Sequence, residues 1–244
     1  MTVRLDTLLV DRGLARSRSQ AATLVREGRV RVGGVTVRKP ATAVPPQADL
    51  DVDVDPWVSR AAHKLLGALD DLGIAVPDRV LDAGSSTGGF TQVLLSRGAK
   101  RVFAVDVGTD QLAAQLRDDP RVSVHEQTNL RDLTLAHVDG EPVDLVVADV
   151  SFISLTLLLA PLLAVLDSSG AALLMVKPQF EVGRELLGKG GVVRDPAQRA
   201  AAVATVSAAA EALGWRTIAE VASKLPGPAG NVEYFLHLRS AHLC

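Results

Sequence analysis

The stretch RVLDAGSSTGGFT, from Arg79 to Thr91, constrains the fold of this chain more than any other part of the sequence. It begins with β-branched and apolar residues that suit a buried parallel strand, and it then turns through glycine and serine. Apolar residues at helical spacing follow directly. A strand, a glycine-rich turn and a helix in this order present backbone N–H groups and a helix N-terminus to a nucleotide-like ligand. The stretch therefore predicts an α/β domain with a ligand site where its first strand ends.

Beyond residue 79, patterns typical of strands alternate with patterns typical of helices, which predicts a parallel sheet with helices on both faces. The expected strands are Val80–Ala83, Val102–Val107, Val122–His125, Leu145–Asp149, Ala172–Lys177, Ile218–Ala222 and Glu233–Arg239. The expected helices are Thr87–Arg97, Gln111–Arg117, Leu155–Leu166 and Pro196–Leu213. The glycine- and proline-rich loop Leu225–Asn231 joins the last two strands in a hairpin, so we expect one antiparallel strand in the sheet.

The N-terminal part of the chain has a pattern of its own. Two short helical patterns precede RVRVGGVTVRKP, in which apolar and basic residues alternate around a Gly-Gly turn, as in a β-hairpin. Residues 1–45 contain nine Lys and Arg against three acids, whereas the whole chain has a formal net charge of −2. This asymmetry predicts that the N-terminal part binds a polyanion, with a solvated basic face as the alternative. We place the domain boundary near residue 56, which gives domains 1–55 and 56–244.

The composition disfavours several classes of protein. The single cysteine, Cys244, cannot form an internal disulfide and fits a reducing cytoplasm. The N-terminal residues lack the apolar core of a signal peptide, and no stretch reaches the roughly 18 apolar residues of a membrane span. The five histidines show no metal-ligand spacing, so we expect no metal. These features predict a cytoplasmic protein.

Charged residues are expected at the carboxyl ends of several strands, which is the edge where open α/β sheets bind ligands. Asp106 ends the second expected strand, Asp149 the fourth and Lys177 the fifth. An acid in the position of Asp106 accepts ribose hydroxyls, both in a nicotinamide dinucleotide site and in an S-adenosylmethionine site. The first loop contains an acid, Asp82, and lacks the G-x-G-x-x-G spacing of dehydrogenases. Together with the charged strand ends, this favours S-adenosylmethionine.

The N-terminal part resembles the alpha-L RNA-binding domain. The resemblance is carried by Arg4-Leu5-Asp6, by Ser17-Arg18 and by the run GRVRVG that begins at Gly28, all in register. It implies RNA as the partner, and arginine suits this role because its planar guanidinium binds two phosphate oxygens at once. The candidate RNA-binding residues are Arg4, Arg16, Arg18, Arg29, Arg31, Lys39 and, just beyond the boundary, Arg60.

The remainder resembles the FtsJ-type ribose 2′-O-methyltransferases, and the whole chain resembles the TlyA family, also known as hemolysin A. The motifs are DVSFIS from Asp149, KPQFE from Lys177, GGVVRD from Gly190 and GNVE ending at Glu233. The resemblance implies a class I S-adenosylmethionine-dependent methyltransferase with a seven-stranded sheet. It also implies a Lys-Asp-Lys-Glu tetrad, which falls on Lys64, Asp149, Lys177 and Glu233.

The resemblance implies roles for these residues. Lys177 is the expected general base for a ribose 2′-hydroxyl, Asp149 orients it, and Lys64 and Glu233 complete the network. The candidate cofactor-binding residues are Asp82, Gly84, Ser85, Thr87, Gly88, Gly89, Phe90, Asp106, Gln127, Asn129 and Asp149. The implied substrate is cytidine in 16S rRNA, 23S rRNA or both. Two alternatives are a catalytically inactive rRNA-binding assembly factor and a membrane-active hemolysin.

Overall fold

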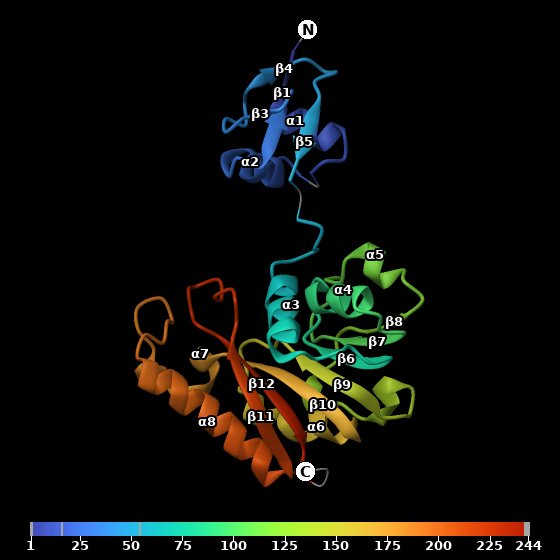
Figure 1. Ribbon diagram of the computed structural model, residues 1–244, viewed down its shortest axis with the longest axis vertical. Coiled ribbons are helices and arrows are strands. Elements are labelled where there is room, and N and C mark those ends of the chain that lie inside the picture. The colour runs from blue at the N-terminus through green and yellow to red at the C-terminus, as the bar shows by residue number, and fades with distance from the viewer. Residues whose placement is uncertain (1, 16, 54, 242–244) are drawn as a thin grey trace. The chain divides into compact units, whose positions relative to one another are not determined.

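The chain divides into two units, Met1–Pro56 and Trp57–Cys244, in a computed structural model that describes residues 2–15, 17–53 and 55–241 (Figure 1). Each unit has a hydrophobic core of its own. The elements of the first unit are β1 (Val3–Arg4), α1 (Leu5–Asp11), α2 (Arg18–Arg26), β2 (Val30–Val32), β3 (Val35–Thr36), β4 (Ala43–Val44) and β5 (Leu50–Val52).

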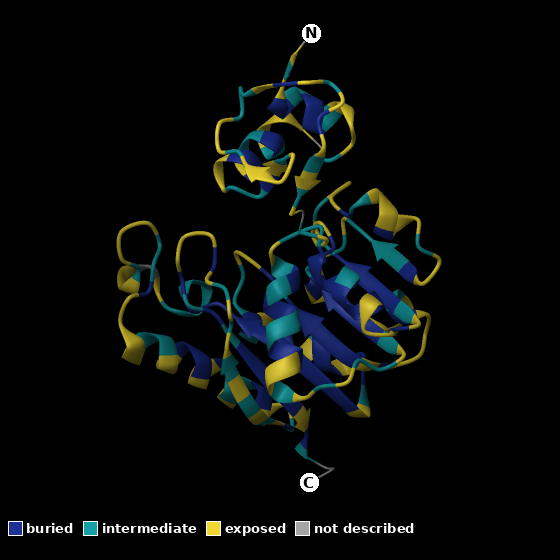
Figure 2. Cartoon of the chain, turned by 45° about the horizontal axis from the view of Figure 1, so that its top comes forward, coloured by how far each residue is buried: buried dark blue, intermediate teal, exposed yellow. Residues whose placement is uncertain are grey.

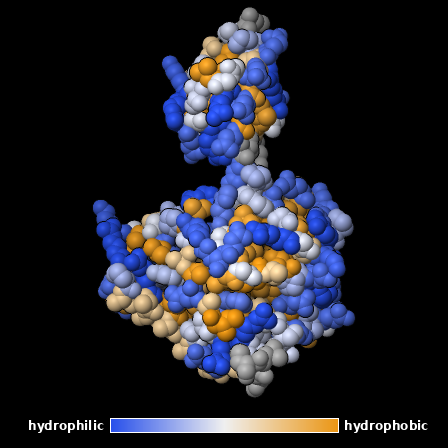
Figure 3. Space-filling model, viewed as in Figure 1, coloured by the Kyte–Doolittle hydropathy of each residue, from blue (hydrophilic) through white to orange (hydrophobic). Residues whose placement is uncertain are grey.

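The first unit packs its two helices and its short strands around apolar side chains. Leu5, Leu9 and Val25 are completely buried in this core. Ser17 caps the N-terminus of α2, because its side chain accepts a hydrogen bond from the backbone N–H of Gln20 at 3.2 Å. Hydrophilic side chains predominate on the face of this unit that Figure 3 shows.

The expected hairpin of the first unit is present, and a third strand extends it. The strands β2 and β3 pair across Gly33 and Gly34, which both have positive φ, as a tight two-residue turn requires. The other edge of β2 pairs with β5, so that Arg31 lies opposite Asp51. The strand β5, which lies just before the predicted domain boundary, is therefore part of the folded unit.

The second unit is built on a seven-stranded sheet with the strand order β11-β12-β10-β9-β6-β7-β8. The strand β12 pairs antiparallel with both of its neighbours, and the other pairings are parallel. This confirms the predicted α/β sheet with one antiparallel strand. The main elements are α3 (Ala61–Leu72), β6 (Arg79–Ala83), α4 (Gly89–Ser96), β7 (Arg101–Val105), α5 (Ala114–Arg117), β8 (Val122–His125), β9 (Val143–Ala148), α6 (Leu159–Ala164), β10 (Leu166–Val176), α7 (Pro178–Glu181), α8 (Pro196–Ala212), β11 (Trp215–Ala222) and β12 (Tyr234–Ser240).

Helices cover both faces of this sheet because successive strand residues point to opposite sides. Leu81 and Phe103 belong to the core beneath α6 and α8, whereas their neighbours Val80 and Val102 belong to the core beneath α3, α4 and α5. All four side chains are completely buried. The strands are accordingly the most buried part of the unit, and the exposed residues lie on the outer helix faces and loops (Figure 2).

The expected helix Leu155–Leu166 is wrong in its extent. The segment forms a 3₁₀ turn at Leu155–Leu157 and then α6, and Leu166 already begins β10. Proline lacks a backbone N–H and is tolerated only in the first turn of a helix, so α6 begins two residues before Pro161. The strand β10 is longer than expected, since it begins at Leu166 instead of Ala172, and an irregularity between Leu166 and Ala171 interrupts its pairing with β9.

The expected helix Gln111–Arg117 is also shorter in the structure, where α5 contains only its last four residues. The carboxylate of Glu126 accepts hydrogen bonds from the backbone N–H groups of Asp110, Gln111 and Leu112 at 2.7, 3.0 and 3.3 Å. The segment before α5 is thus joined to the end of β8 by this carboxylate. The other expected elements of the sheet are present with shifts of a few residues at their ends.

Candidate active site

The loop after β6 lies at the carboxyl edge of the sheet in a geometry that requires glycine. Gly84 has a φ of +85°, and a Cβ at this position would lie 2.7 Å from the carbonyl oxygen of Asp149, just after β9. Only glycine lets the two strand ends approach this closely. The N–H of Asp149 in turn donates to the carbonyl oxygen of Ala83 at 3.0 Å. The loop after β6 and the loop after β9 therefore meet at one point.

Asp106, which follows β7, holds the same loop from its other side. Its two carboxylate oxygens accept hydrogen bonds from the backbone N–H groups of Ser86 at 2.9 Å and Gly108 at 2.7 Å. Gly88 has a φ of +96° and immediately precedes α4. The turn from β6 into α4 is thus fixed by one carboxylate and by two glycines with positive φ.

Two adjoining cavities open at this edge, with volumes of about 400 and 550 Å³. Gly84, Ser86, Asp149 and Ser151 line both cavities, so Asp149 stands at their junction. Residues at the start of α3 and in the loop before β12 complete the first cavity, and residues after β7 and β8 complete the second. An elongated ligand can therefore lie across the junction with one end in each cavity.

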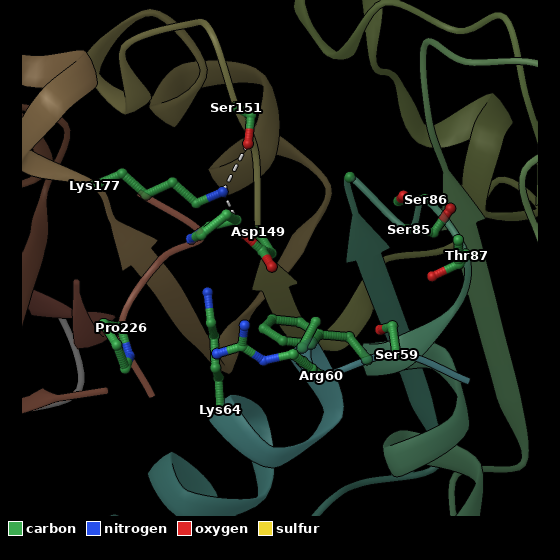
Figure 4. A pocket seen from close by; sticks show the side chains of 15 residues that line it. Ser59, Arg60, Lys64, Ser85, Ser86, Thr87, Asp149, Ser151, Lys177 and Pro226 are labelled. Carbon is green, nitrogen blue, oxygen red and sulfur yellow. Dashed lines mark hydrogen bonds and ion pairs between the residues drawn. The ribbon is translucent and has the colours of Figure 1, made fainter. Parts of the chain in front are cut away.

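Lys177 projects into the first cavity from the end of β10 (Figure 4). Its Nζ lies 2.6 Å from Oδ1 of Asp149 and donates a hydrogen bond to Oγ of Ser151 at 2.7 Å. The side chains of Lys177 and Asp149 are 10% and 15% exposed, so this ion pair is mostly shielded but reachable from the cavity.

A second ion pair joins Lys64 on α3 to Glu233, which immediately precedes β12. The distance from Nζ of Lys64 to Oε2 of Glu233 is 2.6 Å, and the Glu233 side chain is only 1% exposed. Lys64, Asp149 and Lys177 line the first cavity, and Glu233 holds Lys64 from behind. The structure thus brings the four predicted tetrad residues together as two ion pairs.

Ser151 and Phe152 are among the site residues that were not predicted from the sequence. Ser151 contacts Lys177 directly, and Phe152 lies on the wall of the second cavity. Phe152 is 92% exposed and has a φ of +65°, and its ring lies 5.3 Å from that of Phe180, centroid to centroid. Both residues belong to the DVSFIS motif, but a motif does not show which of its side chains are buried.

The candidate cofactor residues are distributed over the two cavities. Both cavities are lined by Gly84. The first cavity is also lined by Ser85, Thr87, Gly89, Phe90 and the candidate RNA-binding residue Arg60. The second cavity is also lined by Asp106 and Asn129. Gly88 lines neither cavity. It packs so closely against the side chain of Leu116 on α5 that a Cβ at this position would collide with it. Gln127 lines neither cavity: it is exposed in a left-handed turn, with a φ of +56°, and its N–H donates to the carbonyl of Gly108.

Asp82 is completely buried inside β6 and lines neither cavity. Its Oδ2 accepts a hydrogen bond of 2.6 Å from Oγ1 of Thr91 on α4. Burial raises the pKa of Asp82 to about 7; the hydrogen bond from Thr91 opposes this, and the nearby charges of Asp149 and Asp106 add to it. Asp82 therefore ties the end of β6 to α4 beneath the loop.

In the first unit, two candidate RNA-binding arginines converge on one acid. Arg4 donates two hydrogen bonds to the carboxylate of Asp6 at 3.0 and 2.7 Å, and Arg18 approaches the same carboxylate at 3.4 Å. The hydrogen bond from Arg4 is the main reason that the pKa of Asp6 is lowered to about 2. Arg16 lies outside the described residues.

Two more candidate arginines face aspartates of the same unit. Arg31 lies 3.6 Å from Asp51, and Arg29 lies 3.9 Å from Asp53. The positive charge of residues 1–45 is therefore partly balanced by acids that follow them directly in sequence. Exposed ion pairs of this kind are weak, so a phosphate can replace the aspartate beside each guanidinium group. The exposed side chain of Lys39 is also accessible to phosphate.

The part of the chain that the structure describes contains no group of three or more His, Cys, Asp or Glu side chains arranged to bind a metal ion. Burial lowers the pKa of His125 and of His237, and the ring of His125 packs edge-on against His137. Among the described helices, none combines the length and the apolar character needed to cross a membrane.

Known proteins match both units. The FtsJ-like methyltransferase family matches residues 57–240, and the S4 domain matches residues 3–50. The 16S/23S rRNA (cytidine-2′-O)-methyltransferase TlyA of Mycobacterium tuberculosis is 55% identical, over 97% of this chain and 90% of that protein. Hemolysin A of Brachyspira hyodysenteriae is 36% identical, over 96% of this chain and 99% of that protein. A solved structure of a protein named a hemolysin, from Streptococcus thermophilus, has a TM-score of 0.76 and 38% identity, and covers 98% of this chain and 88% of that one.

The contact between the two strand ends can be tested with Gly84→Ala. The added Cβ must displace the carbonyl of Asp149, so we expect the affinity for S-adenosylmethionine, the cofactor expected from the sequence, to fall at least ~10-fold when measured by calorimetry. Gly98→Ala is the matched control, because Gly98 also has a positive φ but a Cβ there meets nothing within 4 Å. Equal effects of the two substitutions would show that backbone strain alone, and not this contact, is responsible.

The buried carboxyl of Asp82 predicts a pH dependence of stability. Its pKa is about 7 in the folded state against 3.8 ordinarily, so between these values the folded state holds a proton that the unfolded state has released. The free energy of unfolding should therefore decrease by roughly 1.4 kcal/mol per pH unit from this group as the pH rises from about 4 to about 7.

Asp82→Asn should remove this slope, because an amide still accepts the hydrogen bond from Thr91 but does not titrate. Urea unfolding of both proteins across this pH range measures the difference. The exposed Asp118→Asn should keep the slope of the wild type. An unchanged slope in Asp82→Asn would contradict a raised pKa.

Proposed function

Because the chain belongs to the FtsJ-like methyltransferase family, and within it to the TlyA family, we propose that it methylates ribosomal RNA. The proposed reaction transfers a methyl group from S-adenosylmethionine to the ribose 2′-hydroxyl of a cytidine, in 16S rRNA, 23S rRNA or both. The observation that carries this proposal is the Lys177–Asp149 ion pair at the junction of the two cavities. A donor that lies across this junction and an acceptor bound beside it would both bring their reacting groups to this pair.

The residues around the junction fit S-adenosylmethionine. The carboxylate of Asp106 on the second cavity suits ribose hydroxyls, and Asn129 beyond it suits the adenine. The polar side chains of Ser85 and Thr87 on the first cavity suit the charged methionine end. When bound, the cofactor supplies an electrophilic methyl group.

A ribose 2′-hydroxyl is a weak nucleophile, so the protein must orient it and take its proton. We assign the proton to Nζ of Lys177, which acts as the general base in its neutral form. Ser151 and Asp149 both contact this atom and thereby fix its position in the first cavity. Lys64, held by the buried Glu233, faces the same cavity and is the proposed contact for the ribose.

Phe152 is the proposed support for a base of the RNA. An aromatic side chain that is 92% exposed gains nothing from burial, yet its face is available for stacking, which is worth about 1–3 kcal/mol per base. Its place beside the junction suits a nucleotide turned out of its helix, because a 2′-hydroxyl inside a duplex is hard to reach.

We assign RNA binding to the first unit, through Arg4, Arg18, Arg29, Arg31 and Lys39, and to Arg60 at the first cavity. The match to the S4 domain supports this role. Arginine–phosphate contacts of this kind are salt-sensitive and largely independent of sequence. Since ribosomal RNA is the proposed substrate, we place the reaction in the cytoplasm.

Tritiated methyl transfer to isolated ribosomal subunits that lack the modification tests the proposal. A labelled nucleotide whose RNA linkage resists cleavage by alkali identifies 2′-O-methylation. The subunit that carries the label identifies the target. Lys177→Arg should lower the rate at least ~100-fold, because arginine keeps the positive charge beside Asp149 but does not deprotonate.

Lys100→Arg is the matched control, since Lys100 forms an exposed ion pair of 2.7 Å with Asp78. Both residues precede their strands, at the edge of the sheet opposite the cavities, and line neither cavity. A Lys177→Arg protein with the wild-type rate would eliminate Lys177 as the base. A wild-type protein that binds the cofactor but labels neither subunit would favour the inactive assembly factor.

Phe152→Ala should raise the KM for RNA about 10-fold while the affinity for S-adenosylmethionine stays within about 3-fold. Phe152→Trp, which keeps an aromatic face, should restore most of the affinity for RNA. Steady-state methylation with graded amounts of the target subunit measures KM. If alanine and tryptophan behave alike, stacking at this position is not used.

A further inference from the structure

Three contacts, in the same order along both segments, join the loop after β9 to the end of β10 and α7. Lys177 donates its hydrogen bond to Ser151, and the ring of Phe180 packs against that of Phe152. The third contact is made by Glu181, the last residue of α7. The loop after β9, which carries Ser151 and Phe152, is thus held at three successive points by the segment that contains Lys177, Phe180 and Glu181.

Both carboxylate oxygens of Glu181 accept hydrogen bonds from this loop. Oε2 accepts a hydrogen bond from Oγ of Ser154 at 2.5 Å, and Oε1 accepts one from the backbone N–H of Leu155 at 2.8 Å. Burial raises the pKa of Glu181, and these two hydrogen bonds act against that shift. A half-buried carboxylate with both oxygens used in this way is a strong local restraint.

The loop needs such a restraint because of the backbone at Phe152. A left-handed conformation costs roughly 1–2 kcal/mol for a residue other than glycine, and it persists only where the surroundings impose it. Phe152 has a φ of +65° and is 92% exposed, so its own burial does not supply the restraint. The fixed points on either side are Ser151, held by Lys177, and Ser154 and Leu155, held by Glu181.

We infer that Glu181 is a positioning residue for methyl transfer, which fixes the left-handed turn at Phe152 and the alignment of Ser151 with Lys177 by holding Ser154 and Leu155. The inference rests on the proposed function, because the groups that it aligns are those assigned to the transfer. Glu181 lines neither cavity, so it acts through the loop and not on a substrate.

Amide hydrogen exchange of the full chain tests the restraint without RNA. In Glu181→Ala, the amide of Leu155 loses its acceptor, so its exchange should quicken at least ~10-fold, together with the amides of residues 150–154. Glu181→Gln keeps an acceptor for this amide and should stay close to the wild type. Glu211→Ala, on the exposed face of α8, is the matched control.

Methylation kinetics test the consequence. Glu181→Ala should lower kcat about 10-fold through Ser151 and raise the KM for RNA through Phe152, with Glu181→Gln restoring most of both. Adding Glu181→Ala to Phe152→Ala should raise the KM little further, because both changes remove the same support. Ser154→Ala should reproduce part of the effect, and it carries the test if Glu181→Ala does not fold.

Faster exchange at Leu155 with normal kinetics would overturn the positioning role. Slower turnover in Glu181→Ala with unchanged exchange across residues 150–155 would overturn it as well. A wild-type chain that methylates no RNA would defeat the proposed function and with it the positioning role, whereas the exchange data would still show whether Glu181 restrains the loop.

Discussion

The close approach of β6 and β9 is the constraint on which the rest of the site depends. The chain runs from β6 to β7 and β8 on one side of the sheet and then crosses to β9 on the other, so these two strands flank the point where the strand order reverses. Open α/β sheets bind their ligands at this point. Gly84 allows the two strand ends to touch, which places the loop proposed to bind the cofactor against the acid that pairs with Lys177.

The two lysine–carboxylate pairs serve placement more than stability. Removing an ion pair from water costs about as much as the pair returns, so apolar residues of similar volume would stabilise a core at least as well. The chain nevertheless keeps Glu233 almost completely buried behind Lys64. Each pair comes from elements far apart in sequence, so the positions of both amino groups depend on the whole sheet being formed.

The sequence predicted the sheet well because its signals are local. Alternation of apolar residues and glycine turns marked the strands, and charged residues after Val105, Ala148 and Val176 marked the edge of the sheet where the two cavities open. The sequence failed where distant partners decide the local structure. Glu126 accepts hydrogen bonds from backbone N–H groups just before α5, and Phe152, with a left-handed φ, packs against Phe180 of α7. The pairing of the aspartate-bearing strand β5 with β2 likewise joins segments about 20 residues apart in sequence.

Those aspartates change what the first unit offers to a polyanion. Arg29 and Arg31 already have carboxylate partners, so a phosphate that binds them displaces an internal anion as well as solution counterions. Random RNA, which contacts few arginines at a time, gains little from such an exchange. A folded RNA that presents several phosphates in the spacing of these arginines gains from all the exchanges at once. For the proposed RNA binding, these internal acids would therefore favour an RNA whose fold presents several phosphates at once, without any base being read.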